Sequence, residues 1–151
     1  MRLVIQRVSS AAVQVAEETV GRIGRGLLVL VGVERGDGRE QMRAAVDKLV
    51  HLRLFPDAEG RMNLDSAAAG GAFLIVSQFT LAASLERGRR PSFERAAPPA
   101  EAEALIGELV AGLRHAGFEV ATGRFGASMQ VSLVNDGPVT FVLDLPAAGP
   151  A

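Results

Sequence analysis

Residues 27–33 read Leu-Leu-Val-Leu-Val-Gly-Val, and no polar side chain interrupts this run. A continuous aliphatic stretch of this kind is typical of a central strand that is covered on both faces. Residues 72–76, Ala-Phe-Leu-Ile-Val, form a second such run directly after Gly70-Gly71. We therefore expect both stretches to be buried strands.

Alternating apolar patterns predict further strands toward both ends of the chain. Residues 2–16 alternate in two parities, which predicts one long strand or two strands with a bend near Ser9-Ser10. Residues 129–133 and 139–145 alternate again, and the Asn135-Asp136-Gly137-Pro138 stretch between them predicts a hairpin turn. Shorter strands are expected at residues 19–24, 52–55 and 119–122.

Two segments show the apolar spacing of amphipathic helices. The first covers residues 39–51. The second opens at Pro98-Pro99 and is closed by Gly117. Strands and helices thus do not alternate regularly along the chain, which predicts an α+β fold. We expect mostly antiparallel sheets that form a sandwich or barrel-like core, with two helices packed on one side.

Length and composition exclude several classes of protein. The 151 residues predict one domain, over residues 1–145, and the tail at 146–151 has nothing to bury and is expected to be disordered. The absence of Cys excludes thiol catalysis and a disulfide framework. No apolar run approaches the ~20 residues of a membrane span, and the N-terminus lacks the cleavage site of a signal peptide. We therefore expect a cytoplasmic protein that binds no membrane.

Conventional catalytic groups are scarce. His51 and His115 fall near the ends of the two expected helices, where the helix dipole favours a partly cationic imidazole, so a structural role is expected for both. The sequence contains no His pair and no His–carboxylate pair with the spacing of a metal site. Its glycine spacing fits neither a phosphate-binding loop nor a dinucleotide fingerprint. An enzyme with this inventory would need no metal or cofactor and would work by positioning and by backbone amide donors.

Three stretches break local rules and are candidate sites. Ser77-Gln78-Phe79-Thr80 places polar side chains at the end of a buried strand, where hydroxyls and backbone N–H groups could face a cleft; the alternative is a strand that frays into a loop. Asn135 to Thr140 is a second candidate or simply a turn. In the loop at residues 86–93, Arg87, Arg89 and Arg90 could bind phosphates, or form a solvated basic loop. Because the net charge is −1, nucleic acid could bind only through such a local patch.

Arg7 is a further anomaly. It shares the parity of Leu3 and Ile5, so an unbroken strand would direct its guanidinium toward the apolar side, where it would need acceptors. A bulge or an exposed strand end is the alternative.

Two of these motifs carry a resemblance to a known family. Ser77-Gln78-Phe79-Thr80 and Asn135-Asp136-Gly137-Pro138-Val139-Thr140, in this order and ~55 residues apart, resemble the motifs of bacterial-type D-aminoacyl-tRNA deacylases, the D-tyrosyl-tRNA deacylase family. The match runs from Ile5 to about Leu145, with supporting stretches at residues 57–63, 90–93 and 122–129. These enzymes hydrolyse the ester between a D-amino acid and its tRNA.

The resemblance implies a homodimer with shared active sites. Ser77, Gln78, Phe79 and Thr80 of one subunit would line the cleft, and a cis peptide of Gly137 and Pro138 from the partner would reach into it. Two carbonyl oxygens of that unit would accept from the α-amino group of the substrate. An L side chain would collide with the peptide, whereas a D side chain would point to solvent. Glycyl-tRNA, including glycine mischarged on tRNA-Ala, should also be cleaved.

The resemblance also implies a mechanism without a titrating side chain. Backbone N–H groups around Gln78 and Phe79 would hold the oxyanion, and the 2′-hydroxyl of the terminal adenosine would orient the attacking water. The rival mechanism uses the Thr80 hydroxyl as nucleophile, although no base is visible to activate it.

The remaining residues are given supporting roles by the same resemblance. These are Phe125 and Met129 for the adenosine pocket, with core packing as the alternative, and Arg7, with Asn135 as a further support, for steadying the Gly-Pro carbonyls. The expectation that Arg87, Arg89 and Arg90 contact the tRNA backbone comes from their charge and not from the resemblance. Two other functions stay open on the residues alone: a tRNA- or nucleotide-binding module without catalysis, and a dimeric β scaffold in which the polar residues serve turns.

Overall fold

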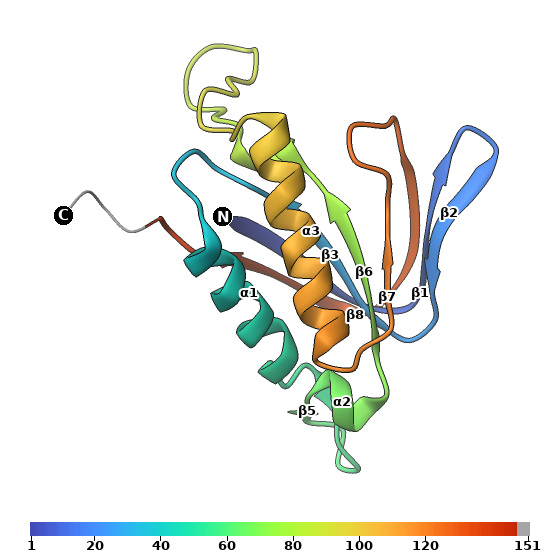
Figure 1. Ribbon diagram of the computed structural model, residues 1–151. Helices are drawn as coiled ribbons and strands as arrows, with labels where there is room; N and C mark the ends of the chain where they lie inside the picture. Colours follow the sequence, from blue (N-terminus) through green and yellow to red (C-terminus); the bar gives the residue numbers. More distant parts are fainter. Residues whose placement is uncertain (148–151) are drawn as a thin grey trace.

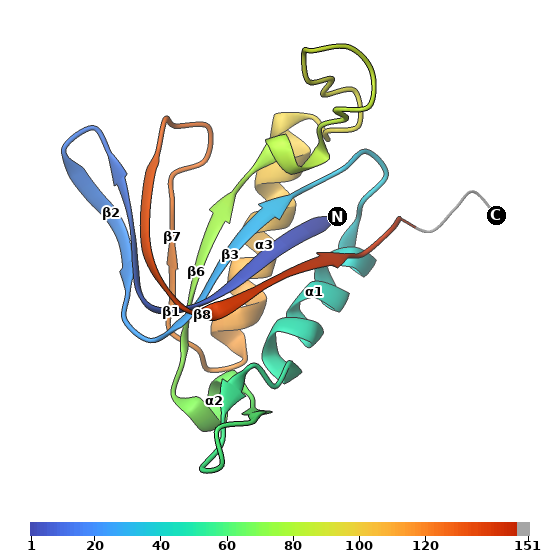
Figure 2. The same ribbon diagram turned by 180° about the vertical axis from the view of Figure 1, so that it is seen from behind.

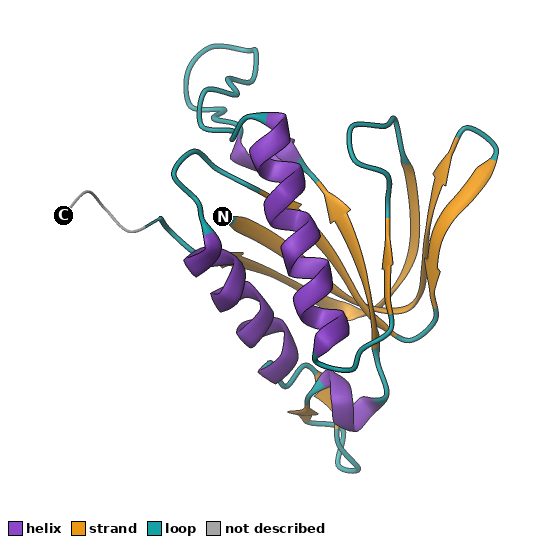
Figure 3. Ribbon diagram, viewed as in Figure 1, coloured by secondary structure: helices purple, strands orange, loops and turns teal. Residues whose placement is uncertain are grey.

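The computed structural model describes residues 1–147 as a curved sheet with helices against one face (Figures 1 and 3). The main sheet has six strands in the order β2-β1-β3-β6-β7, and β8 also pairs with β1. Its strands are β1 (Arg2–Val15), β2 (Glu18–Ile23), β3 (Gly26–Gly32), β6 (Ala72–Ser77), β7 (Val120–Thr122) and β8 (Gln130–Asp144). A small second sheet holds β4 (Phe55–Pro56) and β5 (Met62–Leu64). The helices are α1 (Arg39–His51), α2 (Ser66–Ala69), the 3-10 helix η1 (Phe79–Ala82) and α3 (Pro99–His115).

This architecture confirms the α+β class and the barrel-like core, with α1 and α3 on one side. The two aliphatic runs are β3 and β6, both almost fully buried. The short helix α2 was not predicted; the Asp65 side chain caps it by accepting from the Ala68 N–H. Four of the strand pairs are antiparallel, but β3–β6 and β6–β7 are parallel. The parallel pairs matter for the site, because they align the carboxyl ends of adjacent strands.

Strand β1 connects two apolar clusters on opposite faces of the sheet. Leu3 and Ile5 belong to the larger cluster under α1 and α3, whereas Val8, Ala11 and Val13 belong to the second. Ala11 and Val13 have the same odd parity as Leu3 and Ile5 but belong to the other cluster, so the alternation between faces shifts within one continuous strand. Of the two arrangements predicted for residues 2–16, the structure therefore shows the one long strand, with an irregularity. The pairing register with β8 shifts at the same place, between residues 6 and 10.

The sheet curls until β2 approaches β7, which nearly closes the barrel. Gly21 of β2 lies so close to β7 that a Cβ at this position would be 2.2 Å from the carbonyl oxygen of Thr122. No residue larger than glycine fits there without a backbone shift. The second apolar cluster, which includes Ile23, Leu74 and Val76, fills the interior of the curl.

The predicted hairpin between residues 129 and 145 is wrong. Both halves belong to one strand, β8, and both pair with β1, from Arg2↔Asp144 to Gln14↔Gln130. Figure 2 shows β8 beside β1 along the sheet. The long β1 offers enough edge for both halves. At the end of this pairing, the Arg2 guanidinium is hydrogen-bonded to the Asp144 carboxyl and lowers the pKa of that carboxyl. Among the described residues, the other edge of β8 has no partner strand.

The remaining features follow the sequence closely. His51 and His115 are the last residues of α1 and α3, as predicted. The expected tail, 146–151, lies outside the described residues from 148 onward. Within residues 1–147, no helix has the length and apolarity needed to cross a membrane.

Candidate active site

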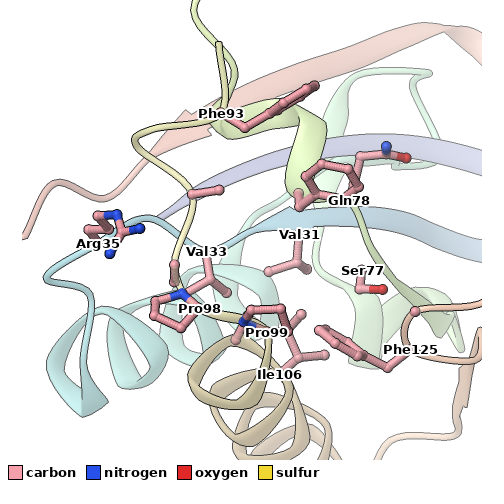
Figure 4. Close-up of a pocket in the computed structure, with 15 residues that line it drawn as sticks. Val31, Val33, Arg35, Ser77, Gln78, Phe93, Pro98, Pro99, Ile106 and Phe125 are labelled. Atoms are coloured by element: carbon pink, nitrogen blue, oxygen red, sulfur yellow. The ribbon is translucent and has the colours of Figure 1, made fainter. Parts of the chain in front are cut away.

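A pocket of about 440 Å³ lies at the carboxyl ends of β3 and β6, next to the start of α3 (Figure 4). The parallel pairing of β3 and β6 places both strand ends at one edge, where crevices of open α/β sheets bind ligands. Its lining combines apolar and aromatic side chains with the polar end of β6. The lining residues are Val31, Val33, Arg35, Ser77, Gln78, Phe79, Phe93, Ala96, Ala97, Pro98, Pro99, Ala102, Ile106, Phe125 and Gly126.

The first predicted motif forms the polar side of this pocket. Ser77 ends β6, Gln78 follows it, and η1 begins at Phe79, so the chain does not continue as a strand. The Gln78 N–H donates to the carbonyl oxygen of Val31 at 2.8 Å, which extends the parallel ladder by one residue. Gln78 therefore cannot serve as a free amide donor, which corrects the expectation for this residue.

The next two amides are available. Phe79 and Thr80 open η1, and the first N–H groups of a helix have no acceptor within the helix. Among residues 1–147, neither N–H has a hydrogen-bond acceptor. Phe79 lines the apolar pocket and Thr80 directly follows it, so two adjacent unsatisfied donors are available to a developing negative charge.

Among the residues that the structure describes, the Thr80 hydroxyl has no basic partner. It accepts a hydrogen bond from the Gln78 side-chain amide, and that amide nitrogen cannot remove a proton. Within the described part of the chain, residues 1–147, the pocket lining contains no His, Asp, Glu or Lys, and Arg35 is its one charged side chain. His51 lies at the end of α1, where it contacts Asp47. The described residues also contain no cluster of three or more His, Cys, Asp or Glu that could hold a metal.

Aromatic rings form two sides of the pocket. The rings of Phe79 and Phe93 are 5.2 Å apart between centroids and tilted by 54°, and both are unusually exposed, at 60% and 41%. Figure 4 shows Phe93 and Phe125 on opposite sides of the cavity. Exposed rings around an apolar space suit a planar, aromatic ligand.

Of the two residues expected in an adenosine pocket, only Phe125 lines this cavity. Met129 instead packs against the second apolar cluster. A Cβ on Gly123 would be 2.6 Å from the Met129 sulfur, so the thioether fills the space that this glycine leaves. The alternative of core packing is the one that the structure supports for Met129.

The second motif forms a protrusion from β8. Gln6 pairs with Thr140 and Val8 with Asn135, so Arg7 alone stands opposite residues 136–139. The Asn135 side chain holds the base of the protrusion by donating to the carbonyl oxygens of Arg7 and Val139, each at 3.0 Å.

The Gly137–Pro138 peptide bond within this protrusion is cis. Both residues are exposed, and neither lines the pocket of their own chain. The two motifs are therefore not brought together in a single subunit.

Arg7 supports the same protrusion. Its side chain is 11% exposed and donates to the carbonyl oxygens of Asp136, at 2.9 Å, and Leu54, at 2.7 Å. It also lies 3.2 Å from the Asp136 carboxylate. These oxygen atoms are the acceptors that a guanidinium directed toward the apolar side of the strand was expected to need. The carbonyl that it binds is the one before Gly137, whereas the resemblance implied the carbonyls of the Gly-Pro unit itself.

Several lining residues were not among the candidate site residues predicted from the sequence. Val31 and Val33 continue the aliphatic run of β3, and Pro98-Pro99 marks a helix start, so a search of strand and helix ends could have found them. Arg35 lies in a turn after β3, and its Nε donates to the carbonyl oxygen of Glu94 at 2.8 Å. Only the tertiary structure shows that it reaches the pocket. Arg87, Arg89 and Arg90 are exposed and lie outside the lining.

Comparisons with known proteins agree over nearly the whole chain. A family model described as D-Tyr-tRNA(Tyr) deacylase matches residues 4–144. A D-aminoacyl-tRNA deacylase from Azotobacter vinelandii is 56% identical over 144 residues, covering 95% of this chain and 99% of the relative. One from Teredinibacter turnerae is 54% identical with the same coverage of both chains. A solved structure of a "c-Myc DNA Unwinding Element Binding Protein" superposes with a TM-score of 0.91 at 37% sequence identity. The match covers 97% of this chain and 100% of that chain. The chain described here therefore belongs to the D-Tyr-tRNA(Tyr) deacylase family.

Proposed function

We propose that this protein is a hydrolase that cleaves the ester bond of D-aminoacyl-tRNA and releases the free D-amino acid and tRNA in the cytoplasm. The observation that carries this proposal is the unsatisfied amide of Phe79, which lines an apolar pocket, together with that of Thr80, the next residue in the chain. Among residues 1–147, the lining of this pocket holds no His, Asp, Glu or Lys. An aminoacyl ester is already reactive, so donors and positioning can supply much of the catalysis.

The Phe79 and Thr80 amides are the oxyanion donors in this proposal. Removing one such donor typically costs ~2.7–4 kcal/mol of transition-state stabilisation. The terminal adenine lies against the apolar wall that includes Phe125 and Ile106, and its 2′-hydroxyl orients the attacking water. This role of the 2′-hydroxyl predicts a requirement for RNA rather than DNA.

Handedness is selected by a peptide from a second copy of the chain. Gly137 and Pro138 lie outside the pocket of their own subunit, so the Gly-Pro unit must come from a partner to meet the substrate. The exposed side chains of Leu133, Val134, Phe141 and Val142 on β8 support a homodimer through this strand, whose free edge and apolar surface would otherwise face water. Because selection acts by exclusion, glycyl-tRNA is also a substrate.

Complementation between two inactive variants tests this shared site. Gly137→Ala damages the contributed peptide, and Phe79→Pro removes one oxyanion donor. Random mixing of the two gives half mixed dimers, each with one intact site, so activity should recover to about a quarter of the wild-type value. No recovery, in a mixture shown by native mass spectrometry to contain mixed dimers, would place the Gly-Pro unit in its own subunit's site.

A nucleic-acid-binding module without catalysis is the second candidate. The name of the similar solved structure, a DNA unwinding element binding protein, and the arginines of the 84–95 loop favour it. Incubation with D-tyrosyl-tRNA separates the two. The deacylase releases D-tyrosine from charged tRNA with multiple turnovers, whereas a binding module retains the RNA and leaves the ester intact.

A further inference from the structure

The loop at residues 84–95 concentrates positive charge beside the pocket. It holds four arginines and two glutamates, in a chain whose net charge is −1. Arg87, Arg89 and Arg90 are exposed, and within residues 1–147 none of them forms an ion pair or donates a side-chain hydrogen bond. The neighbouring Arg95, by contrast, pairs with Glu34 at 2.7 Å.

The stem of this loop is fixed to the pocket wall. Ser84 and Ser92 exchange two backbone hydrogen bonds, at 2.8 and 3.0 Å. Arg35 donates from its side chain to the Glu94 carbonyl oxygen at 2.8 Å, and Phe93 packs against Phe79. The three free arginines therefore sit on a segment whose base is part of the binding pocket, and Figure 3 shows this segment projecting past the start of α3.

We propose that Arg87, Arg89 and Arg90 bind the backbone phosphates of the RNA strand that leads into the pocket. This inference rests on the proposed function, because a pocket that holds the terminal nucleoside must let the preceding nucleotides leave past its rim. Guanidinium groups bind phosphate oxygens in bidentate fashion, and contacts of this kind position a nucleic acid without reading its sequence. The loop is then a sequence-independent clamp on the tRNA end.

The first test measures binding of uncharged tRNA as a function of salt. The variant R87Q/R89Q/R90Q is compared with R22Q/R43Q/R53Q, which removes three exposed arginines on β2, on α1 and after α1. Losing three phosphate contacts should reduce the slope of log K against log salt by about 2 and weaken binding at low salt at least about tenfold. The control, with the same change in net charge, should keep the wild-type slope. A third variant, R87K/R89K/R90K, should recover most of the slope, because it keeps the charge.

The second test compares two substrates. The ratio of kcat/KM on D-tyrosyl-tRNA to kcat/KM on 3′-D-tyrosyl-adenosine should fall about tenfold in the loop variant, because only the tRNA reaches the loop. An unchanged slope in the loop variant, or an equal loss in the control, overturns the proposal. If the wild type binds tRNA but cleaves neither substrate, the proposed function fails while the salt slopes still decide the role of the loop.

Discussion

The Arg7 guanidinium donates a 2.9 Å hydrogen bond to the carbonyl oxygen of Asp136, the residue directly before Gly137. This contact joins the irregularity in β1 to the protrusion of β8. Arg7 also donates to the Leu54 carbonyl oxygen, so one side chain links the protrusion to the segment that follows α1. The position of the Gly-Pro unit in the proposed dimer depends on it.

Arg7→Gln should therefore affect both stability and activity. Hydrogen bonds from a charged donor typically contribute about 1.5–3 kcal/mol each, so the loss of both should lower the free energy of unfolding, measured with urea, by about 3 kcal/mol or more. The kcat/KM for D-tyrosyl-tRNA should fall by more than the change in folded fraction explains. Arg2→Gln is the matched control: its pair with Asp144 is exposed, at 37% and 57%, and should contribute less than about 1 kcal/mol. Equal effects from the two variants would contradict the role given to Arg7.

Gly137→Ala should abolish the proposed selectivity. A Cβ at this position would lie 2.0 Å from the Val139 nitrogen and 2.7 Å from the Asn135 side-chain oxygen, so the backbone of the protrusion must shift. We expect a folded dimer that has lost activity on D-tyrosyl-tRNA and therefore no longer distinguishes it from the L enantiomer. Gly24→Ala, where nothing lies within 4 Å of the new Cβ, should behave as the wild type. A change in stability alone for Gly137→Ala would favour the scaffold hypothesis.

Thr80→Val separates the two mechanisms. The substitution keeps the backbone N–H and the approximate shape but removes the hydroxyl that accepts from Gln78. If this hydroxyl only orients its neighbour, single-turnover kcat should fall less than about tenfold, because one hydrogen bond contributes about 1 kcal/mol. A nucleophilic Thr80 would instead leave no measurable ester cleavage and would form an acyl-enzyme visible by mass spectrometry in the wild type.

Asp37→Asn should lower the stability of the fold, and the substituted residue lies away from the polar side of the pocket. The Met1 ammonium is buried and lies 2.7 Å from the Asp37 carboxylate, which is 1% exposed. Removing one partner of a buried pair typically costs about 3–5 kcal/mol, so thermal unfolding should occur at a clearly lower temperature. Asp47→Asn, which breaks an exposed pair with His51, should change the free energy of unfolding by less than about 0.5 kcal/mol.

The sequence predicted the buried strands and the two long helices because their patterns are local. The runs at 27–33 and 72–76, the helical spacing at 39–51 and the Pro98-Pro99 start all appear in the structure. The hairpin failed because alternation around an Asp-Gly turn looks the same whether the halves pair with each other or with a third strand. Only the length of β1, set elsewhere in the chain, decides between these arrangements.

The site was predictable in its motifs but not in its assembly. Ser77, Gln78, Phe79 and Phe125 line one pocket, whereas Thr80, the fourth residue of the first motif, is not among the lining residues. The hydrogen bond from the Gln78 N–H to the Val31 carbonyl oxygen depends on the parallel pairing of β6 with β3. The position of Met129 depends on the space that the missing side chain of Gly123 leaves for its sulfur. Both are long-range packing relationships that no local pattern encodes.

The rates at which the protein hydrolyses D-tyrosyl-tRNA and L-tyrosyl-tRNA, measured side by side on the same tRNA, test the central claim most directly. Steric sorting by the Gly137–Pro138 peptide predicts rapid loss of the D ester, with the L ester decaying at its uncatalysed rate. Equal rates for the two enantiomers, or no hydrolysis of either, would contradict it.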